Sequence, residues 1–140
     1  MRAALLVPIA ILVSACLLPA KQFSLTLDGK GVVDDLPVIV EDRSGQVVAV
    51  APALPGQFNL QEGIAAGDAP SDIVVTWLGG QCDHHAHLAV DAANGIYTIT
   101  ETTESARSCS LAGFLRTVTI RFSVPVRPGS VTLEHQAIAR

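Results

Sequence analysis

Hydrophobic and polar side chains alternate along most of the chain after residue 22, and this period of two constrains the fold more than any other feature. The clearest run, residues 116–124, reads RTVTIRFSV. Successive side chains of a β-strand point to opposite faces, so such a run has one apolar face and one polar face. Because no stretch shows the 3.6-residue period of an amphipathic helix, the chain is expected to fold as strands.

Turn-forming residues divide this pattern into eight short strands. Four of them read FSLTLD from residue 23, LPVIVED from residue 36, QVVAVA from residue 46 and SDIVVTWL from residue 71. The letters DRSG predict a hairpin between the second and the third, and the proline- and glycine-rich stretch 51–71 predicts a long loop. We therefore expect an all-β fold, a small antiparallel β-sandwich of the immunoglobulin-like kind. Trp77 precedes both cysteines of the domain, an order that differs from a true immunoglobulin domain.

Asn94 and Gly95 form the strongest short-range hairpin signal in the chain, because a type I′ turn needs two residues with positive φ. A two-residue turn there makes facing pairs of His85 with Glu104, His87 with Thr102, Ala89 with Thr100 and Val90 with Ile99. Both histidines then lie on the solvent-facing side. Glu101 breaks the pattern, since it would face inward opposite Leu88.

The first fifteen residues have the order of a secretory signal, with Arg2 first, then an apolar run over 3–13, then small residues. The run contains Pro8 and is much shorter than the roughly 20 residues that a spanning helix needs. Residues 1–15 are therefore expected to be a signal peptide that is removed. The positive mean hydropathy of +0.44 comes largely from this segment.

The signal ends in Val13-Ser14-Ala15-Cys16, which resembles the lipobox of bacterial lipoproteins. The resemblance implies that Cys16 becomes the first residue of the mature protein and carries a lipid built on diacylglycerol and palmitate. An ordinary signal peptide cut at the same place would instead leave Cys16 as a free thiol.

The lipobox resemblance also implies a membrane and a geometry. Residues 16–22 would be the lipidated cysteine and a short tether, and 17–22 span about 20 Å when fully extended. The single remaining domain, 23–140, would therefore lie close to the membrane surface. Leu17 favours sorting to the outer membrane, facing the periplasm, if the organism has two membranes.

The chain has three cysteines, and an odd cysteine in an exported protein needs an explanation. If Cys16 carries lipid, Cys82 and Cys109 remain as an even pair in an oxidising compartment and are expected to form a disulfide bond. The alternative is a redox-active thiol pair. No CxxC spacing supports that reading.

Three of the four histidines lie in the segment QCDHHAHLAV, residues 81–90. On one strand face, the α-carbons of His85 and His87 would be about 6.8 Å apart, so both imidazoles could reach one zinc or copper ion. Zinc needs at least a third protein ligand, for which Glu104 is the candidate, with His84 or His135 in reserve. The alternative is that these imidazoles are solvated side chains without a metal and that the protein has no cofactor.

Other function classes find little support in the residues. The formal net charge is −4, without the basic runs that nucleic acid requires, so no nucleic-acid partner is expected. The chain contains no GxSxG, HExxH or GxxxxGK[ST] motif. Arg116 and Arg121 flank a strand with a Thr-rich polar face and are expected to pair with acids such as Glu101.

Together these features predict a lipid-anchored protein of the cell envelope that is not an enzyme. Its expected role is structural or binding, with the membrane as one partner through Cys16 and an envelope protein as a further one. The competing hypothesis is an envelope metal-binding protein that uses the histidine cluster.

Overall fold

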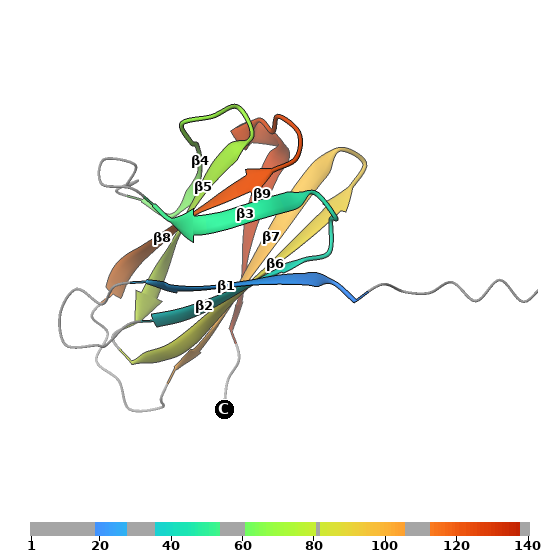
Figure 1. Cartoon of the computed structure of the whole chain (residues 1–140). Helices are drawn as coiled ribbons and strands as arrows, with labels where there is room; N and C mark the ends of the chain where they lie inside the picture. The colour runs from blue at the N-terminus through green and yellow to red at the C-terminus, as the bar shows by residue number, and fades with distance from the viewer. Residues whose placement is uncertain (1–18, 28–35, 54–60, 81, 106–112, 138–140) are drawn as a thin grey trace, which may run out of the picture.

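The structure of the protein, a computed structural model, describes residues 19–27, 36–53, 61–80, 82–105 and 113–137 (Figure 1). These residues form nine strands and one short 3-10 helix. The strands are β1 (Lys21–Leu27), β2 (Leu36–Asp42), β3 (Val47–Pro52), β4 (Gly63–Ala66), β5 (Asp72–Gly80), β6 (Asp83–Ala93), β7 (Ile96–Ser105), β8 (Gly113–Phe122) and β9 (Val131–Ala137), and the helix η1 is Pro128–Ser130. In this described part of the chain, no helix has the length and apolarity to span a membrane.

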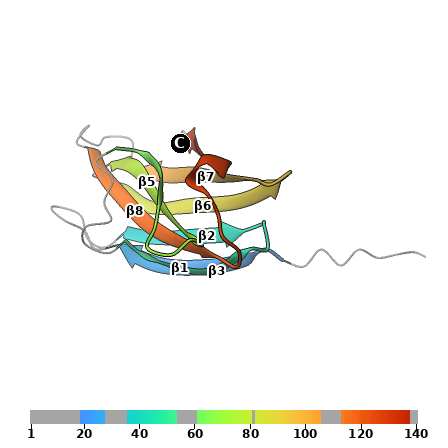
Figure 2. The ribbon, with the colours of Figure 1, turned by 90° about the horizontal axis from the view of Figure 1, so that it is seen from above.

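The strands form two sheets that pack face to face, so the predicted all-β sandwich is confirmed. One sheet, sheet A, has the order β1-β2-β6-β7-β9, and the other, sheet B, has the order β3-β8-β5-β4. In Figure 2, β2, β6 and β7 lie side by side while β5 and β8 cross over them. Most pairings are antiparallel, but β2–β6 and β7–β9 are parallel. The two parallel pairings arise because the chain reaches β6 from β5 and β9 from β8, both strands of sheet B, and not through a hairpin within sheet A.

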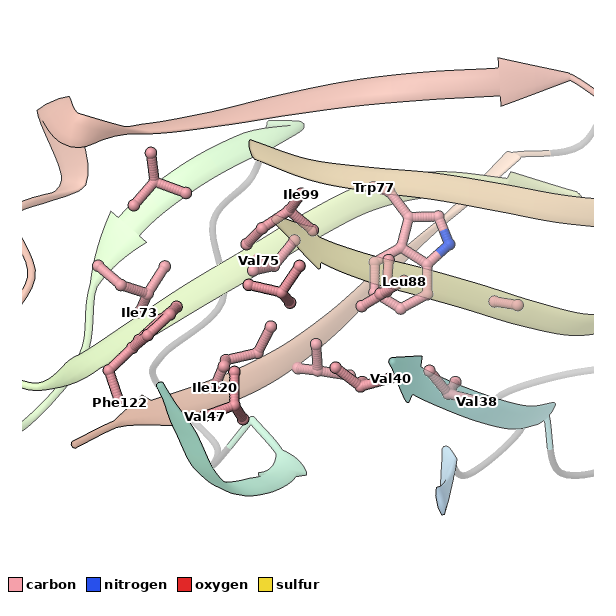
Figure 3. Close-up of a cluster of buried hydrophobic side chains, with 14 of the residues drawn as sticks. Val38, Val40, Val47, Ile73, Val75, Trp77, Leu88, Ile99, Ile120 and Phe122 are labelled. Carbon is pink, nitrogen blue, oxygen red and sulfur yellow. The ribbon is translucent and has the colours of Figure 1, made fainter. Parts of the chain in front are cut away.

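The core lies between the sheets and is built from alternate residues of the strands (Figure 3). Its largest fully buried side chains are Trp77, Phe122, Leu36, Ile73, Leu88, Ile99 and Ile120, together with Val38, Val40, Val75 and Val90. Trp77 is wholly buried and shares its strand face with Ile73 and Val75, as the alternation in SDIVVTWL predicts. Burial of this apolar surface is the main favourable contribution to folding.

The hairpin predicted at DRSG is wrong, because β2 belongs to sheet A and β3 to sheet B. The segment between them is an arch that carries the chain across the core. Asp42 is buried and organises it: Oδ1 accepts hydrogen bonds from the Ser44 and Gly45 amides and the Ser44 hydroxyl, and Oδ2 accepts one from the Val47 amide. Gly45 has a φ of 72°, which a residue without a Cβ adopts without strain. The connection is therefore an Asx-type turn between the two sheets and not the predicted hairpin.

A second difference from the prediction concerns residues 51–71, which were expected to form a loop. This stretch contains a strand that was not predicted, β4. Its four residues Gly63–Ala66 pair with β5 at the edge of sheet B. The segment GIAA has one β-branched residue, three small residues and no alternation of apolar and polar side chains, so its strand signal is weak. Its backbone is ordered by the neighbouring strand rather than by its own propensity.

Candidate functional sites

The hairpin of β6 and β7 presents the histidines, and its register agrees with the prediction from the sequence. His85 faces Glu104 and His87 faces Thr102 across the two strands. The turn has φ values of 53° at Asn94 and 78° at Gly95, as a type I′ turn requires. The solvent-facing side of sheet A therefore carries both imidazoles at its centre.

Each of these imidazoles contacts a different carboxylate. His85 Nε2 lies 3.2 Å from Glu104 Oε2, and His87 Nε2 lies 3.1 Å from Glu41 Oε2 on the neighbouring strand β2. Arg43 continues this row, since its guanidinium donates two hydrogen bonds to Glu41. These bonds, and secondarily the nearby His87, lower the pKa of Glu41. The outer face of sheet A thus carries a row of ionisable side chains that contact one another.

The predicted metal ligands are only partly brought together. Glu104 lies beside His85 as expected, whereas His87 is turned toward Glu41 instead. Among the described residues, no group of three or more His, Cys, Asp or Glu side chains is arranged to hold a metal ion. His84 is exposed at the start of β6 and His135 lies on β9, so neither reserve ligand joins the pair.

A pocket opens where the edge of sheet A, β9, meets the edge of sheet B, β4. Its volume is about 370 Å³. It is lined by Glu62, Leu78, Gly79, Gly80, Asp83, Glu101, Thr103, His135 and Gln136. We call it the edge pocket.

Glu101 and His135 form the centre of the edge pocket. They face each other across β7 and β9, and His135 Nδ1 lies 3.0 Å from Glu101 Oε2. His135 Nε2 lies 3.7 Å from Glu62 Oε1, an atom that also accepts the Leu78 amide at 2.6 Å. The Thr103 hydroxyl donates to Glu101 on the same side. One imidazole therefore lies between the carboxylates of Glu101, on β7, and Glu62, which directly precedes β4.

Glu101 is a buried acid, with 5% of its surface exposed. Burial raises its pKa, and the negative charges of Asp83 and Glu62 act in the same direction, while the contact with His135 opposes them. Asp83 is buried too, and its Oδ2 accepts the Gly80 amide at 2.6 Å. The pocket thus gathers three carboxylates, of which Glu101 and Asp83 are buried and Glu62 is exposed.

The edge pocket was missed from the sequence, although one signal pointed toward it. Glu101 was the single residue that broke the inward alternation of its strand, and it does face inward. Its partners His135 and Glu62 lie 34 and 39 positions away in the chain, and only the sheet order brings them together. An acidic residue at a position predicted to be apolar was therefore the only signal of this pocket that the sequence offered.

The expected cross-strand pairing of Arg121 with an acid is confirmed, but the acid is not Glu101. Arg121 makes a two-pronged contact with Asp72 on β5, at 2.7 Å and 3.0 Å, rather than with Glu101. This hydrogen bonding lowers the pKa of Asp72. Arg116 is buried on the same face as Trp77, its cross-strand neighbour, and so does not lie on a polar face.

The cysteines are described in part. Cys82, just before β6, is disulfide-bonded. Its expected partner Cys109 lies outside the described residues, as does the expected lipidation site Cys16. The pairing of Cys82 with Cys109 therefore stays a prediction.

Comparison with known proteins adds no relative to this picture. A scan against protein-family models, a search of curated proteins and a search of solved structures each return no match to this chain. What can be inferred about function therefore comes from its own residues and their arrangement.

Proposed function

We propose that the chain is the precursor of a lipid-anchored cell-envelope protein whose β-sandwich has a binding role without catalysis. Residues 1–15 are the signal peptide, Cys16 carries the lipid, and the domain follows after a short tether. The sequence Val13-Ser14-Ala15-Cys16 supports the anchor, and β1 begins only five positions later, at Lys21. The domain is held at a membrane outside the cytoplasm, which is the outer membrane in a cell that has two.

The edge pocket is the observation that carries the binding role. Its volume of about 370 Å³ falls within the range of small-ligand sites, about 300–1,000 Å³. Three carboxylates, those of Glu62, Asp83 and Glu101, are prominent among the polar side chains of the lining, so a ligand group rich in hydrogen-bond donors fits it best. Thr103 donates to Glu101 instead of lying against His135, so these lining residues form no hydroxyl–imidazole pair for nucleophilic catalysis.

The anchor is tested by labelling cells with radioactive palmitate. The wild-type chain is expected to incorporate label and to sediment with membranes, and the Cys16→Ser chain is expected to do neither. Cys82→Ser is the matched control, because it removes a different cysteine and should leave the labelling intact. A Cys16→Ser protein that stays labelled or membrane-bound would contradict the anchor.

Pocket binding is tested by two-dimensional NMR with two probes, methylammonium and glycerol. The amides of Gly79 and Gly80, which line the pocket, report on occupancy. We expect saturable shifts in the wild type that weaken in Glu101→Gln. The matched control is Glu134→Gln, an exposed acid on β9 that does not line the pocket. Identical titrations in all three proteins, or no shifts with either probe, would refute binding in the pocket.

Metal binding by the outer face of sheet A is the second candidate. It is favoured by the two imidazoles two positions apart, each with a carboxylate within 3.2 Å. Rotation of His87 toward His85 would present nitrogen and oxygen ligands to zinc or copper. Elemental mass spectrometry and zinc titration test this hypothesis. Stoichiometric binding must disappear in His85→Ala/His87→Ala and persist in His84→Ala.

A further inference from the structure

One end of the sandwich collects the start of β1 and several tight connections, and we call it the tether end. It comprises the start of β1, the arch 42–47, the hairpin turn 93–96 and the connection 122–131, which lie together at the right and upper side of Figure 1. Strand register and backbone bonds join them: Lys21 pairs with residue 42, the residue 43 amide donates to the Val90 carbonyl, and the residue 123 amide donates to the residue 46 carbonyl.

The tether end exposes large apolar side chains. Val48, Ile96 and Val124 have 47%, 53% and 42% of their surface exposed. All three are close in the chain to the buried Phe122 or to a residue that contacts it. Val124 lies two positions after Phe122, and Val48 follows Val47, which pairs with Phe122 across the strands. Ile96 precedes Tyr97, whose ring centroid is 4.8 Å from that of Phe122. These three side chains lie on elements of both sheets, and each offers exposed apolar surface at this end of the sandwich.

Exposed basic side chains also lie at the tether end. Among the described residues, every exposed lysine and arginine lies at or beside the tether end, namely Lys21, Arg43, Arg121 and Arg127. Arg43 and Arg121 pair with carboxylates, whereas Lys21 and Arg127 form no ion pair with any described residue. Lys30, Arg107 and Arg140 lie outside the described residues. The acids of the edge pocket lie toward the opposite end, while the acids Glu41, Asp72 and Asp91 at the tether end are the partners of Arg43 and Arg121. Asp68, in the β4–β5 turn beside the tether end, is exposed.

The tether is shorter than the domain that it holds. Five residue steps from Cys16 to Lys21 span at most about 18 Å, whereas the ten steps of β6 span about 33 Å. A lipid on Cys16 therefore brings the tether end to the membrane surface before the far end can reach it. Apolar side chains and free cations are the groups that bind an anionic bilayer surface.

We propose that the tether end docks on the membrane, with Ile96 and Val124 inserted among the lipids and Lys21 and Arg127 against anionic phospholipid headgroups. This inference rests on the proposed lipid anchor at Cys16. Docking would give the domain one orientation, with the edge pocket directed away from the bilayer. The lipid thus supplies attachment, and the tether end supplies orientation.

Quenching of tryptophan fluorescence by brominated lipids tests this orientation. The lipidated mature protein is reconstituted in vesicles of phosphatidylethanolamine and phosphatidylglycerol, with and without brominated acyl chains. Native Trp77 is fully buried and provides a constant background. Ile96→Trp and Val124→Trp are compared with Leu115→Trp, a matched control, since Leu115 is also exposed but lies toward the other end of sheet B.

We expect vesicles to blue-shift the emission of Ile96→Trp and Val124→Trp and brominated lipid to reduce its intensity, and we expect neither change for Leu115→Trp. Adding Lys21→Glu/Arg127→Glu, or replacing phosphatidylglycerol with phosphatidylcholine, should weaken the quenching. Equal quenching at all three positions, or at none, in protein that floats with the vesicles overturns docking while the anchor stands. Wild-type protein that neither carries lipid nor floats overturns both. A blue shift that depends on protein concentration and not on vesicles identifies a second copy of the chain and also overturns docking.

Discussion

Removal of the Asp42 carboxylate, which organises the connection between β2 and β3, is expected to destabilise the protein strongly. This side chain is 3% exposed and accepts four hydrogen bonds within the arch between the sheets. A hydrogen bond to a charged group contributes about 1.5–3 kcal/mol, and water can replace those at the exposed part of the turn. The buried Val47 amide would lose its partner altogether.

We therefore expect Asp42→Ala to lower the free energy of unfolding by about 3–5 kcal/mol, a large share of a typical total of about 5–15 kcal/mol. Asp42→Asn keeps one acceptor oxygen but turns a donor toward the Val47 amide, so a loss of about 1–3 kcal/mol is expected. The matched control is Asp68→Ala. It removes an exposed aspartate of the β4–β5 turn and should change the stability by less than about 0.5 kcal/mol.

Urea unfolding of the Cys16→Ser protein, followed by the emission of its single tryptophan, measures these differences. With a slope of about 1–3 kcal/mol per molar urea, Asp42→Ala should lower the midpoint by at least about 1 M. If Asp42→Ala does not fold, Asp42→Asn still tests the reasoning. A midpoint for Asp42→Ala that matches Asp68→Ala would show that the arch does not depend on this carboxylate.

Three further predictions concern the turns and the titrating acids. Gly95→Ala, at a φ of 78°, should lose about 1–2 kcal/mol in urea unfolding, whereas Gly129→Ala, where φ is not positive and a Cβ meets open space, should lose almost nothing. Equal losses would contradict the left-handed turn. Because Arg121 lowers the pKa of Asp72, its ion pair stabilises the protein above the ordinary Asp pKa of 3.8 and this contribution is lost as the pH falls through the folded pKa. Asp72→Asn should therefore be destabilising at neutral pH, and the deficit should shrink in acid. Because burial raises the pKa of Glu101 above 4.5, the wild type should lose stability relative to Glu101→Gln as the pH rises through the folded pKa. A difference independent of pH would refute the burial effect.

Local patterns were sufficient for much of the fold. The alternation in residues 116–124 predicted β8, and Asn94-Gly95 predicted the β6–β7 register to the residue, because a two-residue turn leaves one pairing. The same patterns could not distinguish a hairpin from an arch at Asp42. Both conformations use the same turn-forming residues, and they differ in which sheet the next strand joins.

The sequence by itself determined that this chain forms strands, which faces those strands bury, and that His85 faces Glu104. Each of these depends on side-chain period or on a turn between near neighbours in the chain. The tertiary structure decided the rest: two parallel pairings, the partner of His87, and the meeting of Glu62, Glu101 and His135 at the edge pocket. Such contacts depend on the order of strands across two sheets, which is set by the packing of the whole core and leaves no local signal in the residues that it brings together.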